Sequence, residues 1–297
     1  MAFRNFWRWW FVAAILAALT AAACGGGDDG LVLKVGGIPD QDASRLTRRY
    51  DGFAAYLSDR LGIDVEYVPS ADYAAVVTAF TQGGLDLAFF GGLTGVQARL
   101  RDDGAQAIAQ RTQDARFHSK FIIVAGRPHN SLEDLRAEAG ELTLTFGSES
   151  STSGHLMPRH FLVQAGLDAD TDFKTSPNFS GSHDVTWQLV EAGAFDVGAL
   201  NGDVWERAVS EGRVDTTKVR VLETTPGYFD YNWTARSSLD QVYGDGFTQR
   251  VKDALLALDQ ETHGDILELF STEGFIETRN ENYQAIENTA RRLGIIK

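Results

Sequence analysis

Cysteine is almost absent from this chain: Cys24 is the only one in 297 residues. An intrachain disulfide is therefore excluded, and the fold has to be stabilised by the packing of its core. Basic residues are also few, with 27 Lys and Arg against 41 Asp and Glu and a formal net charge of −14. A surface this acidic argues against binding to nucleic acid and against electrostatic docking onto anionic lipid.

Two chemical signatures are missing as well. No serine stands in a Gly-x-Ser-x-Gly elbow, the turn that presents the nucleophile of many hydrolases. The six histidines are scattered, and His155 and His160 are five residues apart rather than the four of a helical metal-ligand pair. We therefore expect no enzyme, no catalytic residue, no metal and no cofactor. The alternatives are an exported hydrolase that uses a serine, His183 and an acid, and a metal-binding lipoprotein.

Residues 1–23 have the pattern of a signal peptide. Arg4 and Arg8 supply positive charge, an apolar run follows from 11 to 19, and three alanines precede Cys24. The run is too short to span a bilayer. The segment before Cys24 resembles the box of bacterial lipoproteins, although an alanine stands where leucine is more usual, and residues 24–30 form a Gly/Asp-rich tether. We expect lipidated Cys24 to be the only attachment of the exported chain to the membrane, on its periplasmic or extracytoplasmic face; ordinary secretion is the alternative.

One pattern occurs twice, 110 residues apart. The first copy runs from Ser70-Ala71-Asp72-Tyr73 to Gly83-Gly84-Leu85-Asp86, and the second from Ser180-Gly181-Ser182-His183 to Gly193-Ala194-Phe195-Asp196. Each copy predicts a helix, a glycine stop, a short buried strand, a glycine turn and a second helix. Two halves built on one plan predict a clamshell whose cleft holds a small ligand.

The remaining chain alternates between strand and helix signals, which predicts an α/β fold in which each lobe has a mixed, mostly parallel sheet flanked by helices. We expect lobe one at residues 31–115 and 228–297 and lobe two at 116–227, joined by two hinge crossings near 110–120 and 223–231. The expected strands are 31–36, 65–68, 121–124, 142–146 and 218–222, and the expected helices are 43–61, about 154–164, and two C-terminal ones around 247–258 and 283–293 that pack back onto lobe one.

The stretch from Gly147 to Pro158 carries the strongest chemical signal. A predicted strand precedes the turn and a predicted helix follows it. The turn itself contains the hydroxyl groups of Ser151, Thr152 and Ser153. Unpaired backbone N–H groups and the positive end of the helix dipole meet there, so a tetrahedral oxyanion can be bound without net positive charge. The alternative is plain helix capping by one of the hydroxyl groups.

Three further residues are candidates for the same site. Tyr73 and His183 open the repeated helices, and both helix starts are expected to point into the cleft. Asp203 follows the second copy and has two possible roles. It could be the N-cap of the helix that follows, or it could accept the proton of a protonated oxyanion while repelling fully ionised sulfate or selenate.

These motifs resemble those of the phosphate/phosphite/phosphonate-binding proteins of ABC importers, which have the type 2 periplasmic-binding-protein fold. The resemblance covers about residues 31 to 240 and rests on Ser70-Ala71-Asp72-Tyr73, Ser151-Thr152-Ser153-Gly154 with Pro158, Gly181-Ser182-His183, and Asp203. It implies a monomeric receptor that captures an oxyanion between its lobes and delivers it to a permease with its ATPase. It also implies that the tyrosine, the hydroxyl residues, the histidine and the acid line the ligand site.

The chain departs from the family pattern at two places, so the identity of the oxyanion stays open. Phe117, followed by His118, stands where the family often has tyrosine at the start of the hinge strand, so Phe117 joins the predicted site without a hydroxyl group. Residues 89–99, together with Ile38-Pro39-Asp40-Gln41, resemble more closely a subgroup proposed to carry selenate. A receptor of the same fold for an organic anion such as a sulfonate is a further alternative.

Overall fold

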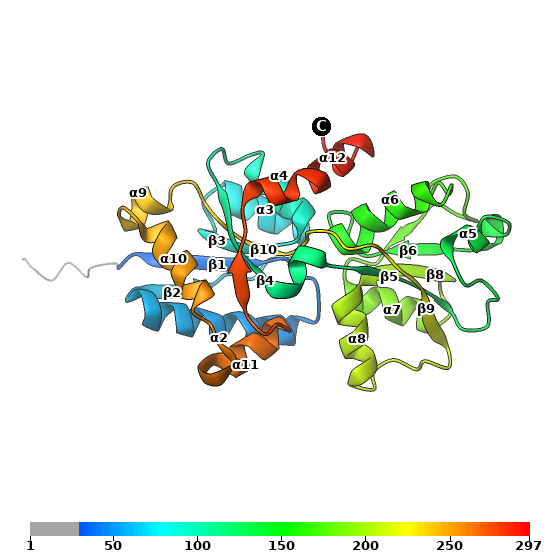
Figure 1. The fold of residues 1–297 in the computed structure, drawn as a ribbon, viewed down its shortest axis with the longest axis horizontal. Coiled ribbons are helices and arrows are strands. Elements are labelled where there is room, and N and C mark those ends of the chain that lie inside the picture. The colour runs from blue at the N-terminus through cyan, green and yellow to red at the C-terminus, as the bar shows by residue number, and fades with distance from the viewer. Residues whose placement is uncertain (1–29) are drawn as a thin grey trace, which may run out of the picture. The chain divides into compact units, whose positions relative to one another are not determined.

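Two β-sheets organise the part of the chain that the computed structural model describes, residues 30–297 (Figure 1). The predicted signal peptide, Cys24 and the tether up to residue 29 lie outside the described residues. Helices pack on both sheets, and the chain passes from one sheet to the other and back. Residues 32–297 are therefore a two-lobed α/β structure, as the sequence predicts.

The first sheet has the strand order β11-β4-β10-β3-β1-β2. Its strands are β1 (Val32–Gly37), β2 (Asp64–Tyr67), β3 (Leu87–Phe90), β4 (Gln106–Arg111), β10 (Asn232–Ala235) and β11 (Phe275–Glu277). Pairing is parallel between β2, β1 and β3 and antiparallel at the other strand pairs.

The second sheet has the order β7-β6-β8-β5-β9. Its strands are β5 (Ser119–Val124), β6 (Leu144–Phe146), β7 (Asn178–Phe179), β8 (Val197–Asn201) and β9 (Val219–Thr224). Pairing is parallel in β7-β6-β8 and antiparallel in β8-β5-β9. Both sheets are thus mixed, with more antiparallel pairing than the alternation predicts. The reason is that β5 and β10 enter each sheet from the other lobe, so they start where the parallel strands end.

Helices cover both sheets. With the first sheet lie α2 (Ala43–Leu61), α3 (Tyr73–Thr81), α4 (Gly92–Arg99), α9 (Leu239–Tyr243), α10 (Phe247–Leu256), α11 (Gln260–Phe270) and α12 (Gln284–Arg292). With the second lie α5 (Leu132–Leu135), α6 (Met157–Gln164), α7 (His183–Glu191) and α8 (Gly202–Ser210). Short 3₁₀ turns occupy Thr112–Arg116, Ala139–Glu141 and Asn280–Tyr283. The C-terminal helices α10 and α12 pack on α2 and α4, as predicted.

The repeated pattern is confirmed as the units α3-β3-α4 and α7-β8-α8, with Tyr73 and His183 each the first helical residue. The aspartate shared by the two copies has one structural role. Asp86 Oδ2 accepts a hydrogen bond from Lys34 N at 3.0 Å, and Asp196 Oδ2 accepts one from Thr143 N at 2.9 Å. Each aspartate thus ties the repeat to the backbone at or beside the neighbouring parallel strand.

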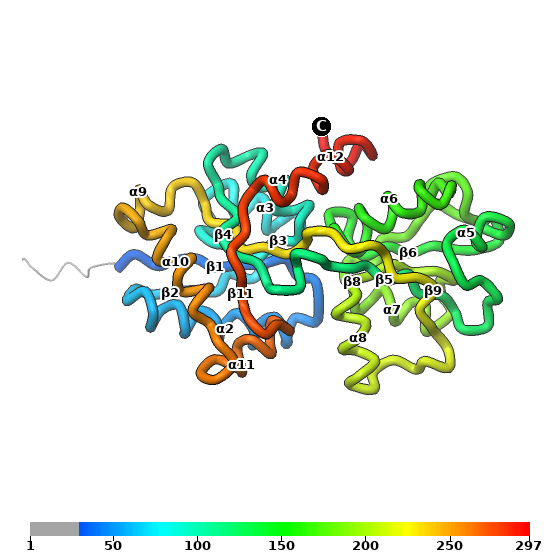
Figure 2. Tube along the Cα trace, viewed as in Figure 1, coloured from blue at the N-terminus to red at the C-terminus, as the bar shows by residue number. Residues whose placement is uncertain are grey.

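The two segments that connect the sheets run side by side (Figure 2). Phe117 N donates to the Tyr228 carbonyl at 2.7 Å, and Tyr228 N donates to the Phe117 carbonyl at 3.0 Å. This pair of hydrogen bonds joins the crossings at their middle, which makes them one two-stranded hinge. None of the helices between residues 30 and 297 is long and apolar enough to cross a membrane.

Candidate functional site

The serine-rich turn follows β6 and is buried. Ser151, Thr152 and Ser153 are each at most 2 % exposed. Ser151 Oγ accepts a hydrogen bond from Gly154 N at 2.9 Å, so this serine caps the next helix. The helix opens with a π turn, Thr152–Leu156, before α6, where a regular helix was expected. Capping alone does not account for the turn, because only one of its three hydroxyl residues performs it.

The backbone N–H groups of Thr152 and Ser153 are available to a ligand. Among the hydrogen bonds of residues 30–297, neither N–H group has an acceptor. Both belong to the first turn of a helix, where N–H groups lack intrahelical partners and the helix dipole favours an anion. Two N–H groups without an acceptor in the described part of the chain therefore lie where the sequence predicts oxyanion donors.

Tyr73 and Asp230 place two unpaired polar atoms beside this turn. The Tyr73 hydroxyl is buried beside Ser151 and has no hydrogen-bond partner in the described part of the chain, and burial raises the pKa of Tyr73. Asp230 Oδ1 accepts a hydrogen bond from Gly92 N at 2.9 Å, whereas its Oδ2 is buried without a partner among residues 30–297. Burial raises the pKa of Asp230 to about 7. Two buried polar atoms without a partner among the described residues therefore lie beside the serine-rich turn, where they are free to pair with a ligand.

The first lobe meets the turn through the start of α4. Leu93 N donates to Thr152 Oγ1 at 2.9 Å. A Cβ atom added to Gly91 would lie 3.2 Å from Thr152 Oγ1 and 3.3 Å from Asp230 Oδ1. The close approach of the lobes at this point therefore depends on a residue without a side chain.

His183 lies on the other side, fully buried at the first position of α7. Its Nδ1 accepts a hydrogen bond from Asn201 N at 3.3 Å, so the proton of the neutral ring is on Nε2. Burial lowers the pKa of His183, which keeps the ring neutral. Nε2 is 3.5 Å from the Tyr231 hydroxyl, a long contact that leaves this N–H able to donate to a ligand.

Phe117 lies in the hinge, 2 % exposed, with its ring centroid 6.2 Å from that of Tyr228 and 5.6 Å from that of Tyr231. Ser119 Oγ donates to the Ser153 carbonyl at 2.7 Å, so the Tyr228 hydroxyl, 2.5 Å away, donates to Ser119. The return crossing thus places a buried hydroxyl group beside Phe117, with its proton donated to Ser119. The sequence analysis missed Tyr228, Asp230 and Tyr231. The signal available there is a run of four aromatic or acidic residues, 228–231, within the predicted return crossing.

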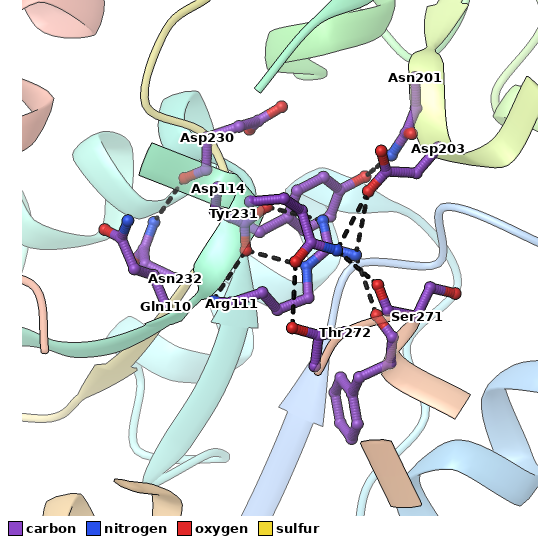
Figure 3. A network of polar contacts seen from close by, with 12 residues as sticks. Gln110, Arg111, Asp114, Asn201, Asp203, Asp230, Tyr231, Asn232, Ser271 and Thr272 are labelled. Atoms are coloured by element: carbon purple, nitrogen blue, oxygen red, sulfur yellow. Dashed lines mark hydrogen bonds and ion pairs between the residues drawn. The ribbon is translucent and has the colours of Figure 1, made fainter. Parts of the chain in front are cut away.

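Asp203 is not the N-cap of α8, so that prediction is wrong. Asn201 caps the helix, with its Oδ1 accepting from Val204 N at 3.0 Å. Asp203 is the second residue of α8. It lies 3.6 Å from Arg111 Nη1 and accepts a hydrogen bond from Gln113 Nε2 at 3.3 Å. Figure 3 shows its carboxylate directed toward this hinge network, whereas the carboxylate of Asp230 points away from it.

Two buried arginines around the site are already paired with carboxylates. Arg111 forms a bidentate ion pair with Asp114, with Nε 2.9 Å from Oδ2 and Nη2 2.7 Å from Oδ1. Arg49 Nη1 lies 3.7 Å from Asp40 Oδ1. Within residues 30–297 no group of three metal-ligating side chains comes together. The donors that remain for a ligand are neutral: backbone N–H groups, hydroxyl groups and an imidazole.

Comparison with known proteins identifies the family. The family described as "ABC transporter, phosphonate, periplasmic substrate-binding protein" matches residues 35–283. The probable ABC transporter phosphite binding protein PhnD1 of Prochlorococcus marinus is 42% identical over 270 residues, which cover 90% of this chain and 91% of that protein. The phosphate-import protein PhnD of Mycolicibacterium smegmatis is 28% identical, over 82% of this chain and 75% of that protein.

A solved structure supports the same relationship. The structure of PhnD1 from Prochlorococcus marinus in complex with methylphosphonate aligns with a TM-score of 0.86 at 43% identity, covering 89% of this chain and 99% of that one. The chain therefore belongs to the periplasmic substrate-binding proteins of phosphonate ABC transporters.

Proposed function

We propose that this protein captures a small, singly protonated phosphorus oxyanion, phosphite or methylphosphonate, between its lobes. The observation that carries the proposal is the convergence of a donor and an acceptor on one turn. The Tyr73 hydroxyl and Asp230 Oδ2 are buried and unpaired within the described chain, and both lie beside the free N–H groups of Thr152 and Ser153. A singly protonated oxyanion offers one proton to the carboxylate and accepts hydrogen bonds at its other oxygens.

Each residue then has a role. The N–H groups of Thr152 and Ser153, the hydroxyls of this turn and of Tyr73, and His183 Nε2 donate to the anion, and Phe117 forms part of the hinge wall behind it. Asp230 accepts the ligand proton, the role that the sequence assigns to Asp203. The charge on Asp230 disfavours fully ionised sulfate, selenate and sulfonates, since two like charges would be buried together.

The size of the ligand is limited by contacts between the lobes. Leu93 N bonds to Thr152 Oγ1 at 2.9 Å, and His183 N donates to the Asp40 carbonyl at 3.2 Å. With the lobes in contact beside the turn, an oxyanion bearing no more than a small substituent fits better than a nucleotide or a long-chain sulfonate. The methylphosphonate bound to the Prochlorococcus relative is a ligand of that size.

The wider role follows from the family. We propose that the lobes, residues 31–115 with 228–297 and residues 116–227, close by rotation about the paired crossings. The closed, monomeric protein would deliver its ligand to a permease with its ATPase, without making or breaking a bond. The signal peptide and a lipidated Cys24 would place it on the extracytoplasmic face of the membrane.

Calorimetric titration of the purified protein tests the proposal. Phosphite, methylphosphonate, phosphate, sulfate and selenate are each titrated near neutral pH. We expect phosphite or methylphosphonate to bind with a Kd of about 1 μM or tighter, about −8 kcal/mol, and sulfate and selenate to bind at least tenfold more weakly. Tighter binding of selenate or sulfate would contradict the proposal, and turnover of phosphoesters above background would restore the hydrolase alternative.

A further inference from the structure

His155 contacts the serine-rich turn but is not among the residues that we propose to bind the anion. The side chain is 5 % exposed. Its Nδ1 is 2.7 Å from the carbonyl oxygen of Glu149, two residues before the capping Ser151. Its Nε2 is 2.9 Å from Nε of Arg159, one turn along α6.

The two contacts determine where the imidazole proton is. A guanidinium N–H can only donate, so His155 Nε2 must accept from Arg159 through its lone pair. The proton of the neutral ring is then on Nδ1, which donates to the Glu149 carbonyl. Arg159 is itself held by Asp170, with Nη1 2.8 Å from Oδ2, and its guanidinium lies 5.4 Å from the centre of the Phe146 ring.

The ring is also fixed by aromatic neighbours. Its centroid is 5.0 Å from that of Phe146, at the end of β6, and 4.9 Å from that of Phe179, at the end of β7. Burial lowers the pKa of His155 to about 4, so the neutral form with its single Nδ1 proton persists at neutral pH. Three side chains and one backbone carbonyl therefore hold this imidazole in one orientation and one tautomer.

The contact has a consequence for the anion site. The Glu149 carbonyl belongs to the same tight turn as the N–H groups of Thr152 and Ser153, in which Ser151 N donates to the Ser148 carbonyl at 2.9 Å. Holding that carbonyl toward His155 keeps its negative end away from the anion and fixes the direction of the N–H groups that follow. We propose that His155 is a positioning residue for oxyanion binding, acting through the Glu149 carbonyl, an inference that rests on the proposed function.

Two substitutions separate this role from simple packing. In His155→Asn the amide N–H₂ group occupies the place of Nδ1 and can still donate to Glu149, whereas in His155→Gln it reaches toward the place of Nε2. We expect phosphite affinity within about threefold of the natural protein for His155→Asn and a loss of at least about tenfold for His155→Gln. His160→Asn and His160→Gln are the matched controls, because His160 bonds only to Gln164 among the described residues, and neither should change affinity.

Calorimetric titration with phosphite is accompanied by urea unfolding of every variant. If His155→Asn and His155→Gln bind equally, or if affinity merely follows stability, His155 is only a packing residue and the inference is overturned. If His155→Gln fails to fold, Arg159→Met gives a second measurement, since it removes the partner that fixes the tautomer. A several-fold loss of affinity then supports the inference, and unchanged affinity overturns it. Failure of the natural protein to bind any phosphorus oxyanion would instead overturn the proposed function.

Discussion

The Tyr231 hydroxyl donates a hydrogen bond to Asp40 Oδ2 at 2.9 Å and accepts one from Asn201 Nδ2, also at 2.9 Å. Asp40 follows β1 in the first lobe, Tyr231 ends the return crossing, and Asn201 ends β8 in the second lobe. One buried hydroxyl group therefore joins both lobes to the hinge, next to His183 of the predicted site. Contacts of this kind exist only while the lobes are together, so they should stabilise the ligand-bound form.

Replacing that hydroxyl group should speed ligand release. In Tyr231→Phe, Asp40 and Asn201 each lose a buried partner, which costs about 1–3 kcal/mol in the closed form. We expect phosphite to dissociate about tenfold or more faster, measured by stopped-flow fluorescence. Tyr243→Phe is the control, since among residues 30–297 its hydroxyl bonds only to Val32 and Asp86 of the first lobe. An equal effect of the two substitutions would show that Tyr231 has no special part in closure.

Asp230 should determine which oxyanions bind. Asp230→Asn keeps an oxygen for Gly92 N but cannot take up a ligand proton as a carboxylate does. We expect phosphite affinity to fall about tenfold or more and sulfate affinity to rise, because a buried like charge is removed. Calorimetry of Asp203→Asn provides the comparison. If that variant, and not Asp230→Asn, changes the preference, Asp203 is the acid of the site, as the sequence first predicts.

The pH dependence of stability gives an independent test of Asp230. Its pKa is raised to about 7 by burial, from 3.8, so between these values the folded protein holds a proton that the unfolded chain releases. The free energy of unfolding of the ligand-free protein should therefore fall as pH rises from about 4 to about 7. For Asp230→Asn this contribution, on the order of 3 kcal/mol, should vanish. Urea unfolding across that range measures it, and equal slopes for the two proteins would contradict the assignment.

Gly91 should be needed for closure. Gly91→Ala places a methyl carbon 3.2 Å from Thr152 Oγ1 and 3.3 Å from Asp230 Oδ1, closer than ordinary van der Waals contact. We expect phosphite binding to weaken several-fold, about 1 kcal/mol, with little change in the urea unfolding midpoint. Gly52→Ala serves as the control. Gly52 lies in α2, and a Cβ atom added there has no neighbour within 4 Å in the described structure. Undiminished binding by Gly91→Ala would mean that the lobes do not approach this closely around the ligand.

Features with local causes were predictable from the sequence. Helix α2 has the predicted limits, 43–61, because Asp42 caps its first turn and Gly62 ends it with a φ of 72°. The starts of α3 and α7 at Tyr73 and His183 follow from the repeated capping pattern, with Asp72 and Ser182 as N-caps.

Features that depend on distant segments were not predictable in the same way. Asp230 reaches the site only because the return crossing lies beside β3 and α4, far away in the sequence, and no local pattern reveals that. Asp203 was misassigned as a cap because Asn201, two residues earlier, has the same capping ability, and local signals do not choose between them. The antiparallel entry of β5 and β10 is likewise a consequence of tertiary arrangement.

The position of the ligand tests the central claim most directly. A crystal structure of the protein grown with phosphite should show the phosphorus atom between the lobes, with its oxygens in hydrogen-bond contact with Thr152 N, the Tyr73 hydroxyl and Asp230 Oδ2. If the anion occupied a site without these three groups while they remained unpaired, the account of the binding site would be wrong.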